Sequence, residues 1–150
     1  MRYYKAWTHE GGAATPFIAH WPAGGLQRGS INRQPGHIID IMPTLLAAAG
    51  LEPPTEKDGQ DLIPFEGVNL LPAWQGGTLT PRSLYWEHFG RKAILEEPWK
   101  LVQDGDQPWE LYHMPSDRTE ENDRVTEQPD RVQRMLEKYE AWAQRIGVRQ

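Results

Sequence analysis

The first twelve residues combine a lysine with aromatic side chains and a Glu-Gly-Gly turn. Lys5 lies a few positions before Glu10, Gly11 and Gly12. A protonated lysine can hold an anion or stabilise negative charge that develops during a reaction. Aromatic neighbours and a glycine turn, where the backbone has unusual freedom, are what a loop needs to hold that cation in place. Lys5 is therefore the leading candidate for site chemistry, although a lone lysine is most often a solvated surface residue.

Two histidines are weaker candidates: His9 in the same loop, and His88 at the end of a predicted strand. No second histidine follows His9 at the spacing of a helical zinc site, and Gly11 and Gly12 would break such a helix. We therefore expect Glu10, the next residue, to be structural and to cap backbone amides. Packing or a hydrogen bond is the simpler role for His88, although functional side chains often collect at strand ends. Both histidines are candidate substrate-binding residues.

The sequence predicts no metal site. Asp58-Gly59 and Asp104-Gly105 resemble calcium loops only faintly, because the later ligands and the closing Glu are missing, so tight turns explain them better. The chain has no cysteine, which excludes a thiolate zinc site, a thiol nucleophile and a disulfide framework. The sequence also lacks a Gly-rich phosphate loop and a nucleophile elbow. A complete catalytic apparatus is therefore not visible.

The composition describes a polar, folded chain. Its 150 residues carry a formal net charge of -5 with dispersed basic residues, which argues against nucleic acid as a partner. No run is apolar enough to cross a membrane, and no secretory signal follows Met1. Seven tryptophans supply apolar area that a disordered chain would lack. The compartment stays open between periplasm and cytoplasm.

The elements that would position the candidate residues fall into two groups. In the first, residues 17–21 are a short apolar run between two prolines, which predicts a buried strand. Residues 36–50 predict a helix with Asp40 as N-cap, Pro43 in the first turn and Gly50 at the left-handed C-terminal position. The buried face of this helix is expected to contain Ile41, Leu45, Ala48 and Ala49.

The second group follows residue 81. Four short apolar runs, separated by turn residues, predict a small antiparallel sheet whose last two strands pair as a hairpin. These runs are residues 83–87, 93–96, 99–103 and 110–114. Residues 129–146 have apolar positions at helical spacing, which predicts an amphipathic helix over one face of the sheet. The residues alone therefore indicate an α+β fold.

Several ordered motifs resemble the C-terminal part of sulfatases of the arylsulfatase family. They are Lys5-x-x-x-His9-Glu10-Gly11-Gly12, Thr15-Pro16-Phe17-Ile18, Trp21-Pro22, residues 39–46, residues 84–88, Trp99-Lys100-Leu101 and residues 109–112, followed by residues 117–122. Since these motifs cover nearly the whole chain in the family's order, the resemblance is specific. It implies an α/β to α+β protein, the C-terminal part of an alkaline-phosphatase-like sulfatase fold.

The resemblance also implies a division of the chain. Residues 1–52 would be terminal elements of the large sulfatase α/β domain, which is incomplete here. Residues 53–81 would be a connecting excursion. Residues 82–150 would form the C-terminal α+β subdomain, a small four-stranded antiparallel sheet packed by a C-terminal helix.

Chemistry follows from the resemblance too. The family hydrolyses sulfate esters with a formylglycine nucleophile and a calcium ion, and Lys5 matches the lysine that contacts the substrate sulfate. This chain lacks the Cys/Ser-x-Pro/Ala-x-Arg nucleophile motif and the Asp and Asn metal ligands of the family. Its three serines lie in other contexts, at Ser30, Ser83 and Ser116. Leu95 and Pro98 replace an arginine and a glycine of the relatives, which could alter the local strand.

We therefore expect a C-terminal fragment of an arylsulfatase-type sulfuric ester hydrolase that is catalytically inactive alone. One alternative is a non-catalytic accessory or binding module that docks on a separate N-terminal sulfatase half. Another is a plain structural domain in which Lys5 is incidental. With most of the parent sheet missing, we expect Phe17, Ile18 and Leu45 to be exposed and the lone chain to self-associate or be loose there. The sequence does not identify the sulfate ester.

Overall fold

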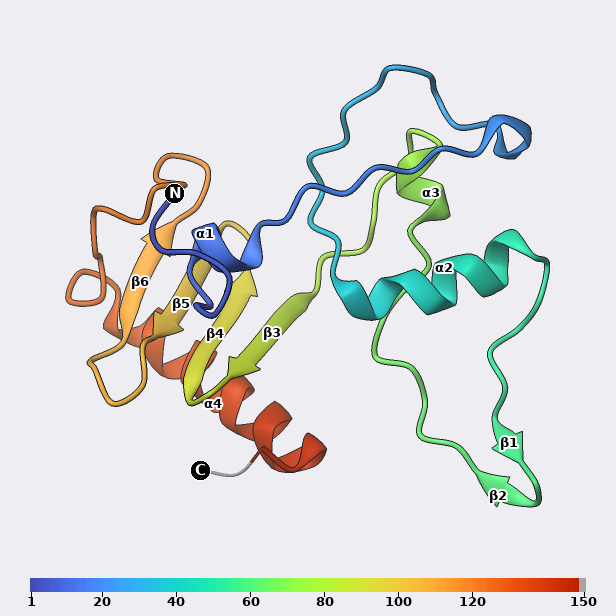
Figure 1. Ribbon diagram of the computed structural model, residues 1–150. Coiled ribbons are helices and arrows are strands. Elements are labelled where there is room, and N and C mark those ends of the chain that lie inside the picture. Colours follow the sequence, from blue (N-terminus) through green and yellow to red (C-terminus); the bar gives the residue numbers. More distant parts are fainter. Residues whose placement is uncertain (149–150) are drawn as a thin grey trace. The chain divides into compact units, whose positions relative to one another are not determined.

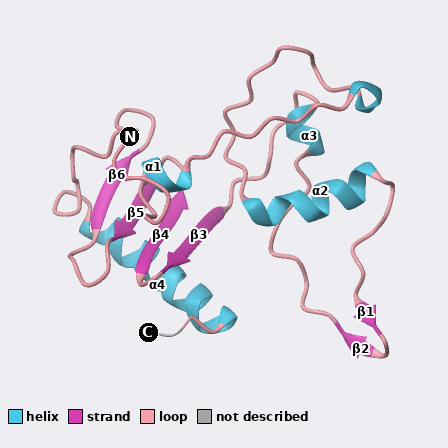
Figure 2. Ribbon diagram, in the orientation of Figure 1, coloured by secondary structure: helices cyan, strands magenta, loops and turns pink. Residues whose placement is uncertain are grey.

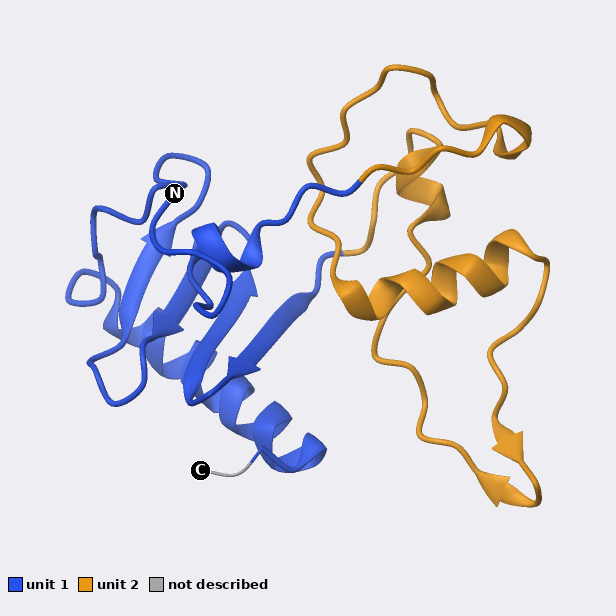
Figure 3. Ribbon diagram, in the orientation of Figure 1, with its two compact units in different colours: residues 1–17, 81–150 blue, residues 18–80 orange. Residues whose placement is uncertain are grey.

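The computed structural model describes residues 1–148 and divides into two compact units, shown in Figures 1 and 3. Unit 1 contains Met1–Phe17 and Pro81–Gln150, and unit 2 contains Ile18–Thr80. The first residues of the chain therefore pack with its C-terminal half, although more than sixty residues separate them in sequence. The predicted boundaries grouped residues 1–52 together, and their assignment to a larger sulfatase domain stays a prediction.

Unit 1 is built on an antiparallel sheet of four strands in the order β3-β4-β5-β6, as Figure 2 shows. The strands are β3 (Ser83–His88), β4 (Arg91–Glu96), β5 (Trp99–Gln103) and β6 (Glu110–His113). Phe89 and Gly90 connect β3 and β4 with φ angles of 51° and 78°, as a tight hairpin turn requires. The predicted four strands and the predicted β5–β6 hairpin are confirmed.

The helix α4 (Pro129–Ile146) covers one face of this sheet and has the predicted bounds. Its apolar stripe buries Met135, Tyr139 and Ala143 against the strand residues Ile94, Leu101 and Leu111. Gly147 ends the helix with a φ of 76°, a left-handed conformation that glycine adopts without strain. This apolar layer is the main core of unit 1.

The opposite face of the sheet carries the first residues of the chain. Alternation along β5 turns Lys100 and Val102 away from α4, because Leu101 between them packs on the helix. Lys100 is fully buried there, with its Nζ 2.9 Å from Glu120 Oε1 and 3.2 Å from Glu10 Oε1. Glu10 begins the short helix α1 (Glu10–Ala13), and its backbone N–H donates to Glu120 Oε2 over 2.8 Å. Lys100 therefore holds the N-terminal segment on the sheet.

Glu10 is structural, as expected, but the expected capping of backbone amides is wrong. Its carboxylate is bound by two side chains, Lys100 and Arg118, with Arg118 Nη2 3.1 Å from Glu10 Oε2. Both partners come from the distant C-terminal half of the chain, so neighbouring residues did not reveal them.

Unit 2 contains short elements held mainly by polar contacts. Its helices are α2 (Ile41–Ala48), preceded by a 3-10 turn (Ile38–Asp40), and α3 (Leu71–Trp74). A second 3-10 turn lies at Pro22–Gly24, and a two-stranded hairpin joins β1 (Glu56–Lys57) to β2 (Gln60–Asp61). A helix forms within the predicted range 36–50, at Ile41–Ala48, and Gly50 has the expected positive φ of 70°. The predicted N-cap role of Asp40 is wrong, because its side chain makes no cap hydrogen bond to this helix.

Two buried polar side chains connect α2 to the segment before α3. Asp40 accepts hydrogen bonds from the backbone N–H groups of His37 and Val68, at 2.7 and 2.9 Å. Thr44 accepts one from the N–H of Leu70 at 2.9 Å. Because the side-chain oxygens of Asp40 and Thr44 accept hydrogen bonds from backbone N–H groups that burial would otherwise leave unpaired, these two side chains fix this helix locally.

The predicted burial in unit 2 is partly wrong. Residues 17–21 form no strand, and Phe17 and Ile18 are 59% and 88% exposed. In α2 the buried residues are Pro43 and Thr44, while Leu45, expected to be buried, is 56% exposed. The separate expectation that Phe17, Ile18 and Leu45 lie exposed is confirmed. An apolar stripe becomes a buried face only where another element covers it. No helix among residues 1–148 is long and apolar enough to span a membrane.

Replacing the buried lysine tests its role in unit 1. Lys100→Met should lower the free energy of unfolding by about 3–5 kcal/mol, because it leaves two buried carboxylates without their shared cation. Urea unfolding followed by tryptophan fluorescence measures the change. Lys138→Met is the matched control, because Lys138 is exposed and pairs only at the surface with Glu96. Equal stability of the two variants would contradict the role given to Lys100.

The two units should differ in amide exchange. We expect slow exchange in β4, β5 and α4, which supply the buried core of unit 1, and fast exchange over residues 17–34, where large apolar side chains are exposed. Hydrogen exchange with mass spectrometry at several chain concentrations would measure both regions and detect self-association. Uniform protection of both regions in a monomer would contradict the expectation.

Candidate functional site

The candidate lysine lies in a turn on unit 1. The N–H of Trp7 donates to the carbonyl of Tyr4 over 3.0 Å, which closes a four-residue turn with Lys5 as its second residue. Lys5 is exposed, whereas Thr8, His9 and Glu10, which follow three to five positions later, are buried. The chain thus presents the lysine ammonium to solvent on a turn whose following residues are anchored.

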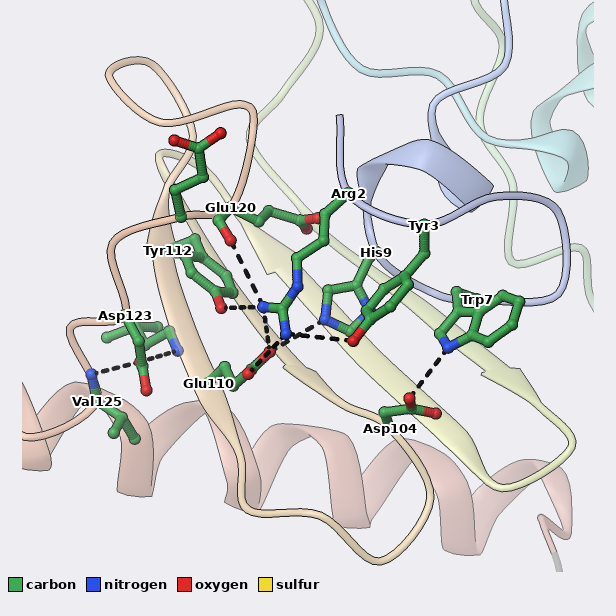
Figure 4. Close-up of polar contacts among 12 residues, drawn as sticks. Arg2, Tyr3, Trp7, His9, Asp104, Glu110, Tyr112, Glu120, Asp123 and Val125 are labelled. Carbon is green, nitrogen blue, oxygen red and sulfur yellow. Dashed lines mark hydrogen bonds and ion pairs between the residues drawn. The ribbon is translucent and has the colours of Figure 1, made fainter.

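Aromatic side chains support this turn. The ring of Trp7 stacks on Tyr3, with centroids 5.2 Å apart and an interplanar angle of 16°, and its centroid lies 5.0 Å from that of Tyr4. The indole N–H of Trp7 donates to Asp104 Oδ2 over 3.0 Å, the contact drawn in Figure 4. The aromatic residues that flank Lys5 in the sequence pack on one another, and Trp7 also joins the turn to the end of β5.

Arg2 anchors the start of the chain to β6. Its guanidinium meets Glu110 with two parallel contacts, Nη1 to Oε2 at 2.9 Å and Nη2 to Oε1 at 3.2 Å (Figure 4). Nη1 also donates to the hydroxyl of Tyr112 over 2.6 Å. Paired contacts of this kind fix orientation as well as distance, so Arg2 sets where the following loop begins.

His9 belongs to the same network. Its ring is completely buried, and its Nε2 lies 3.0 Å from Glu110 Oε2. The rings of His9 and Tyr3 meet in a T-shaped contact with centroids 4.8 Å apart. The buried Nδ1 has no hydrogen-bond partner. In this conformation no nitrogen of His9 reaches solvent, so the side chain supports the loop. Its suggested contact with substrate stays a prediction.

Electrostatic interactions favour the charged forms of both Arg2 and Glu110. Burial alone would raise the pKa of Glu110, but hydrogen bonds from His9 and Arg2 outweigh it and hold that pKa below its usual value. Burial alone would lower the pKa of Arg2, but hydrogen bonds to Glu110 and Tyr3 outweigh this effect and raise that pKa above its usual value. Arg2 and Glu110 therefore both stay ionised near neutral pH.

His88 lies elsewhere on unit 1. It is the last residue of β3, it is exposed, and its ring contacts the neighbouring ring of Phe89 at 4.3 Å between centroids. Among the contacts of residues 1–148 it meets neither Lys5 nor His9. Its candidate role in substrate binding stays a prediction.

The described part of the chain, residues 1–148, contains no group of three or more His, Cys, Asp or Glu side chains that could hold a metal ion. The calcium ion that the resemblance implies therefore finds no such group among the side chains of residues 1–148. Asp104, part of one faint calcium-like segment, instead binds Trp7.

Sequence reasoning missed the residues that hold the loop. Lys100 could have been noticed, because it shares a face of its strand with Val102 and a charged residue at an inward position needs a partner. Arg2 and Glu110 gave no such signal, since 108 positions separate them. Such a pair becomes visible only after the chain folds.

The network with Glu110 predicts a pH dependence of stability. Because folding lowers the pKa of Glu110, its contribution is present above the unfolded pKa of about 4.3 and is lost as pH falls through the lower folded pKa. Glu110→Gln should therefore cost about 2 kcal/mol at pH 7 and nothing at the acid end of the range. Unfolding curves from pH 7 to pH 2 would show the difference, with the exposed Glu121→Gln as control. A loss of stability that is the same at all pH values would contradict this account.

Comparison with known proteins agrees with the fold. A family model described as "N-sulphoglucosamine sulphohydrolase, C-terminal" matches residues 2–144. The N-acetylgalactosamine-6-sulfatase of Canis lupus familiaris is 40% identical over 82 residues, which are 55% of this chain and 14% of that protein. An uncharacterized sulfatase of Schizosaccharomyces pombe is 26% identical over 155 residues, covering 98% of this chain and 28% of that protein.

A solved structure shares the architecture. The crystal structure of Ps i-CgsB in complex with k-i-k-neocarrahexaose superposes with a TM-score of 0.64 and 25% identity, over 83% of this chain and 27% of that one. The chain thus spans between about one seventh and about one quarter of the length of these relatives. Since the family model matches nearly all of it, the chain belongs to the sulfatases and corresponds to their C-terminal portion.

Proposed function

We propose that this chain serves as the C-terminal part of a sulfuric ester hydrolase, in which Lys5 contacts the sulfate group of the substrate. The observation that carries the proposal is the family match over residues 2–144 together with the exposed turn that presents Lys5. Cleavage of a sulfate ester places negative charge on the sulfate and on the leaving oxygen. An ammonium group already held near these atoms stabilises that charge without reorganisation.

The neighbours of Lys5 have supporting roles in this proposal. Arg2, His9 and Glu110 hold the loop on β6, and Lys100 holds α1 on β5. His88, exposed at the tip of a hairpin, is a second position from which a side chain could contact a substrate. Replacing His88 should then raise KM with little change in kcat, whereas loss of Lys5 should lower kcat.

The nucleophile and the metal would come from the rest of the enzyme. A formylglycine needs a Cys or Ser in the family motif, and a calcium ion needs a cluster of oxygen ligands. The chain contains no cysteine, and residues 1–148 offer no metal cluster. These residues therefore do not fit either group, and Lys5 alone cannot supply the millionfold or greater acceleration of an enzyme.

A sulfated sugar is the substrate class that best fits the comparisons. The matching family and one relative are named for sulfate groups on the amino sugars glucosamine and galactosamine. The exposed ring of Tyr4 beside Lys5 offers a flat apolar surface of the kind on which the C–H face of a sugar ring can pack. An aryl sulfate would engage the same lysine, and competition between the two substrate classes distinguishes them.

The exposed apolar side chains of unit 2 suggest what completes the enzyme. Ile18, Ile31, Ile38 and Ile63 are between 78% and 92% exposed, which is unusual for a unit of this size. We propose that further residues of a sulfatase cover them, either within one polypeptide or as a separately encoded N-terminal half. In the second arrangement the chain would be the docking module of a two-part enzyme.

The proposal is tested by removing Lys5 in a complete enzyme. In a hybrid where residues 1–150 replace the matching portion of the S. pombe sulfatase, Lys5→Ala should lower kcat by about 10²–10³-fold, as loss of one charge-stabilising group does. Hydrolysis of sulfated sugars and of a chromogenic aryl sulfate, each with calcium, gives the rates.

Two controls accompany this test. Lys57→Ala removes an exposed lysine of unit 2 and should leave the rate unchanged. The isolated chain should give no turnover above its own Lys5→Ala variant. An active hybrid that tolerates Lys5→Ala, or turnover by the isolated wild-type chain alone, would overturn the proposal.

A further inference from the structure

We propose that Asp104 and Arg91 are positioning residues for Lys5, because together they clamp the ring of Trp7 and so fix the turn that presents the lysine. The assignment rests on the proposed function, since it concerns how the same site is held. The clamp itself, however, is a property of the folded chain and can be measured without a substrate.

One carboxylate links the two sides of the clamp. Asp104 Oδ2 accepts the indole N–H of Trp7 over 3.0 Å, and Oδ1 lies 2.8 Å from Nε of Arg91 in an ion pair. The guanidinium carbon of Arg91 lies 4.6 Å from the centroid of the same indole ring. The three side chains therefore form a closed triangle in which each one contacts the other two.

The sheet supplies the fixed points of this triangle. Arg91 is the first residue of β4, and Asp104 follows directly after Gln103, the last residue of β5. Lys92 and Gln103 pair across the two strands, so the ladder holds Arg91 and Asp104 at one end of the sheet. Trp7 belongs to an irregular loop, and contacts with residues at two strand ends fix its position.

The position of Trp7 determines that of Lys5 through the backbone. The N–H of Trp7 closes the turn onto the carbonyl of Tyr4, and Lys5 and Ala6 are the two central residues of that turn. A shift of Trp7 therefore opens or tilts the turn and moves the lysine. Displacements of about 1 Å in a positioned group can cost about a hundredfold in rate, so such a support has a use at a reaction site.

The small contribution of these contacts to folding stability does not by itself account for the triangle. Arg91 and Asp104 keep 24% and 30% of their side chains exposed, and ion pairs this close to solvent contribute little to folding. The apolar core of unit 1 lies on the other face of the sheet, against α4. The clamp acts on the Lys5 turn and leaves that core untouched.

The test uses the complete 150-residue chain labelled with ¹⁵N at tryptophan. Trp7→Phe assigns the Trp7 indole and amide signals, and their solvent-exchange rates report the clamp and the turn. Asp104→Leu removes both contacts and should speed both rates about tenfold or more, as expected for loss of a hydrogen bond to a charged group. Asp104→Asn keeps an acceptor for the indole and should retain most of the protection.

Matched controls separate the clamp from general loss of structure. Asp106→Leu changes an exposed aspartate in the same connection and should leave the Trp7 signals as in the wild type. Three tryptophans on the α4 side of unit 1 serve as internal references and should keep their shifts in every variant: Trp99, Trp109 and Trp142. If Asp104→Leu disturbs these references, Arg91→Met replaces it, because that change removes the cation and leaves the indole acceptor.

Three results would overturn the inference. The first is that the exchange rates of the Trp7 indole and amide in Asp104→Leu equal those of the wild type, or that they do so in Arg91→Met if that variant replaces Asp104→Leu. The second is an equal effect of Asp106→Leu. The third is faster exchange of the indole with an unchanged Trp7 amide, because the clamp would then not control the turn. None of these readings depends on sulfate ester hydrolysis, so the clamp and the role of Lys5 in catalysis can fail independently.

Discussion

The buried contact of Lys100 with two carboxylates is the interaction on which unit 1 depends. A lysine without access to water keeps its charge only if oxygens replace the water it has lost. Those oxygens come from Glu10, 90 positions before it, and Glu120, 20 positions after it. One cation therefore joins three segments: the start of α1, the middle of β5 and the loop that follows β6. The sheet face opposite α4 therefore carries a polar platform beside a small apolar cluster of Ala93, Val102 and Tyr112.

This platform explains how a loop with almost no regular structure is held in one conformation. Arg2, Trp7 and His9 each attach to a strand or a strand end through charged or aromatic contacts. In this loop His9 is buried, Arg2 and Trp7 are half-buried, and Lys5 is exposed. Functional side chains commonly lie on loops that a rigid scaffold supports. In the proposed enzyme, the C-terminal subdomain would be that scaffold for a lysine that acts on the sulfate.

In unit 2, by contrast, local hydrogen bonds are well made while much apolar surface stays exposed. Asp40 and Thr44 give it good local hydrogen bonds, but many of its large apolar side chains face solvent. Hydrophobic stabilisation grows with the apolar area removed from water, so these residues contribute little until something covers them. The chain spans only a fraction of the length of its sulfatase relatives, and the proposed covering by further sulfatase residues accounts for the exposed surface.

The sequence by itself determined what depends on neighbours along the chain. Short apolar runs between turn residues predicted the four strands, helical spacing predicted α4, and the order of motifs indicated the sulfatase family. It predicted α2 but not the buried side of α2, and it predicted a strand at residues 17–21 that does not form. The candidate Lys5 was visible in sequence, whereas its supports Arg2, Lys100 and Asp104 were not. Burial and ion pairing require a partner in space, and these partners lie 20 to 110 positions away, so only the tertiary structure decided them.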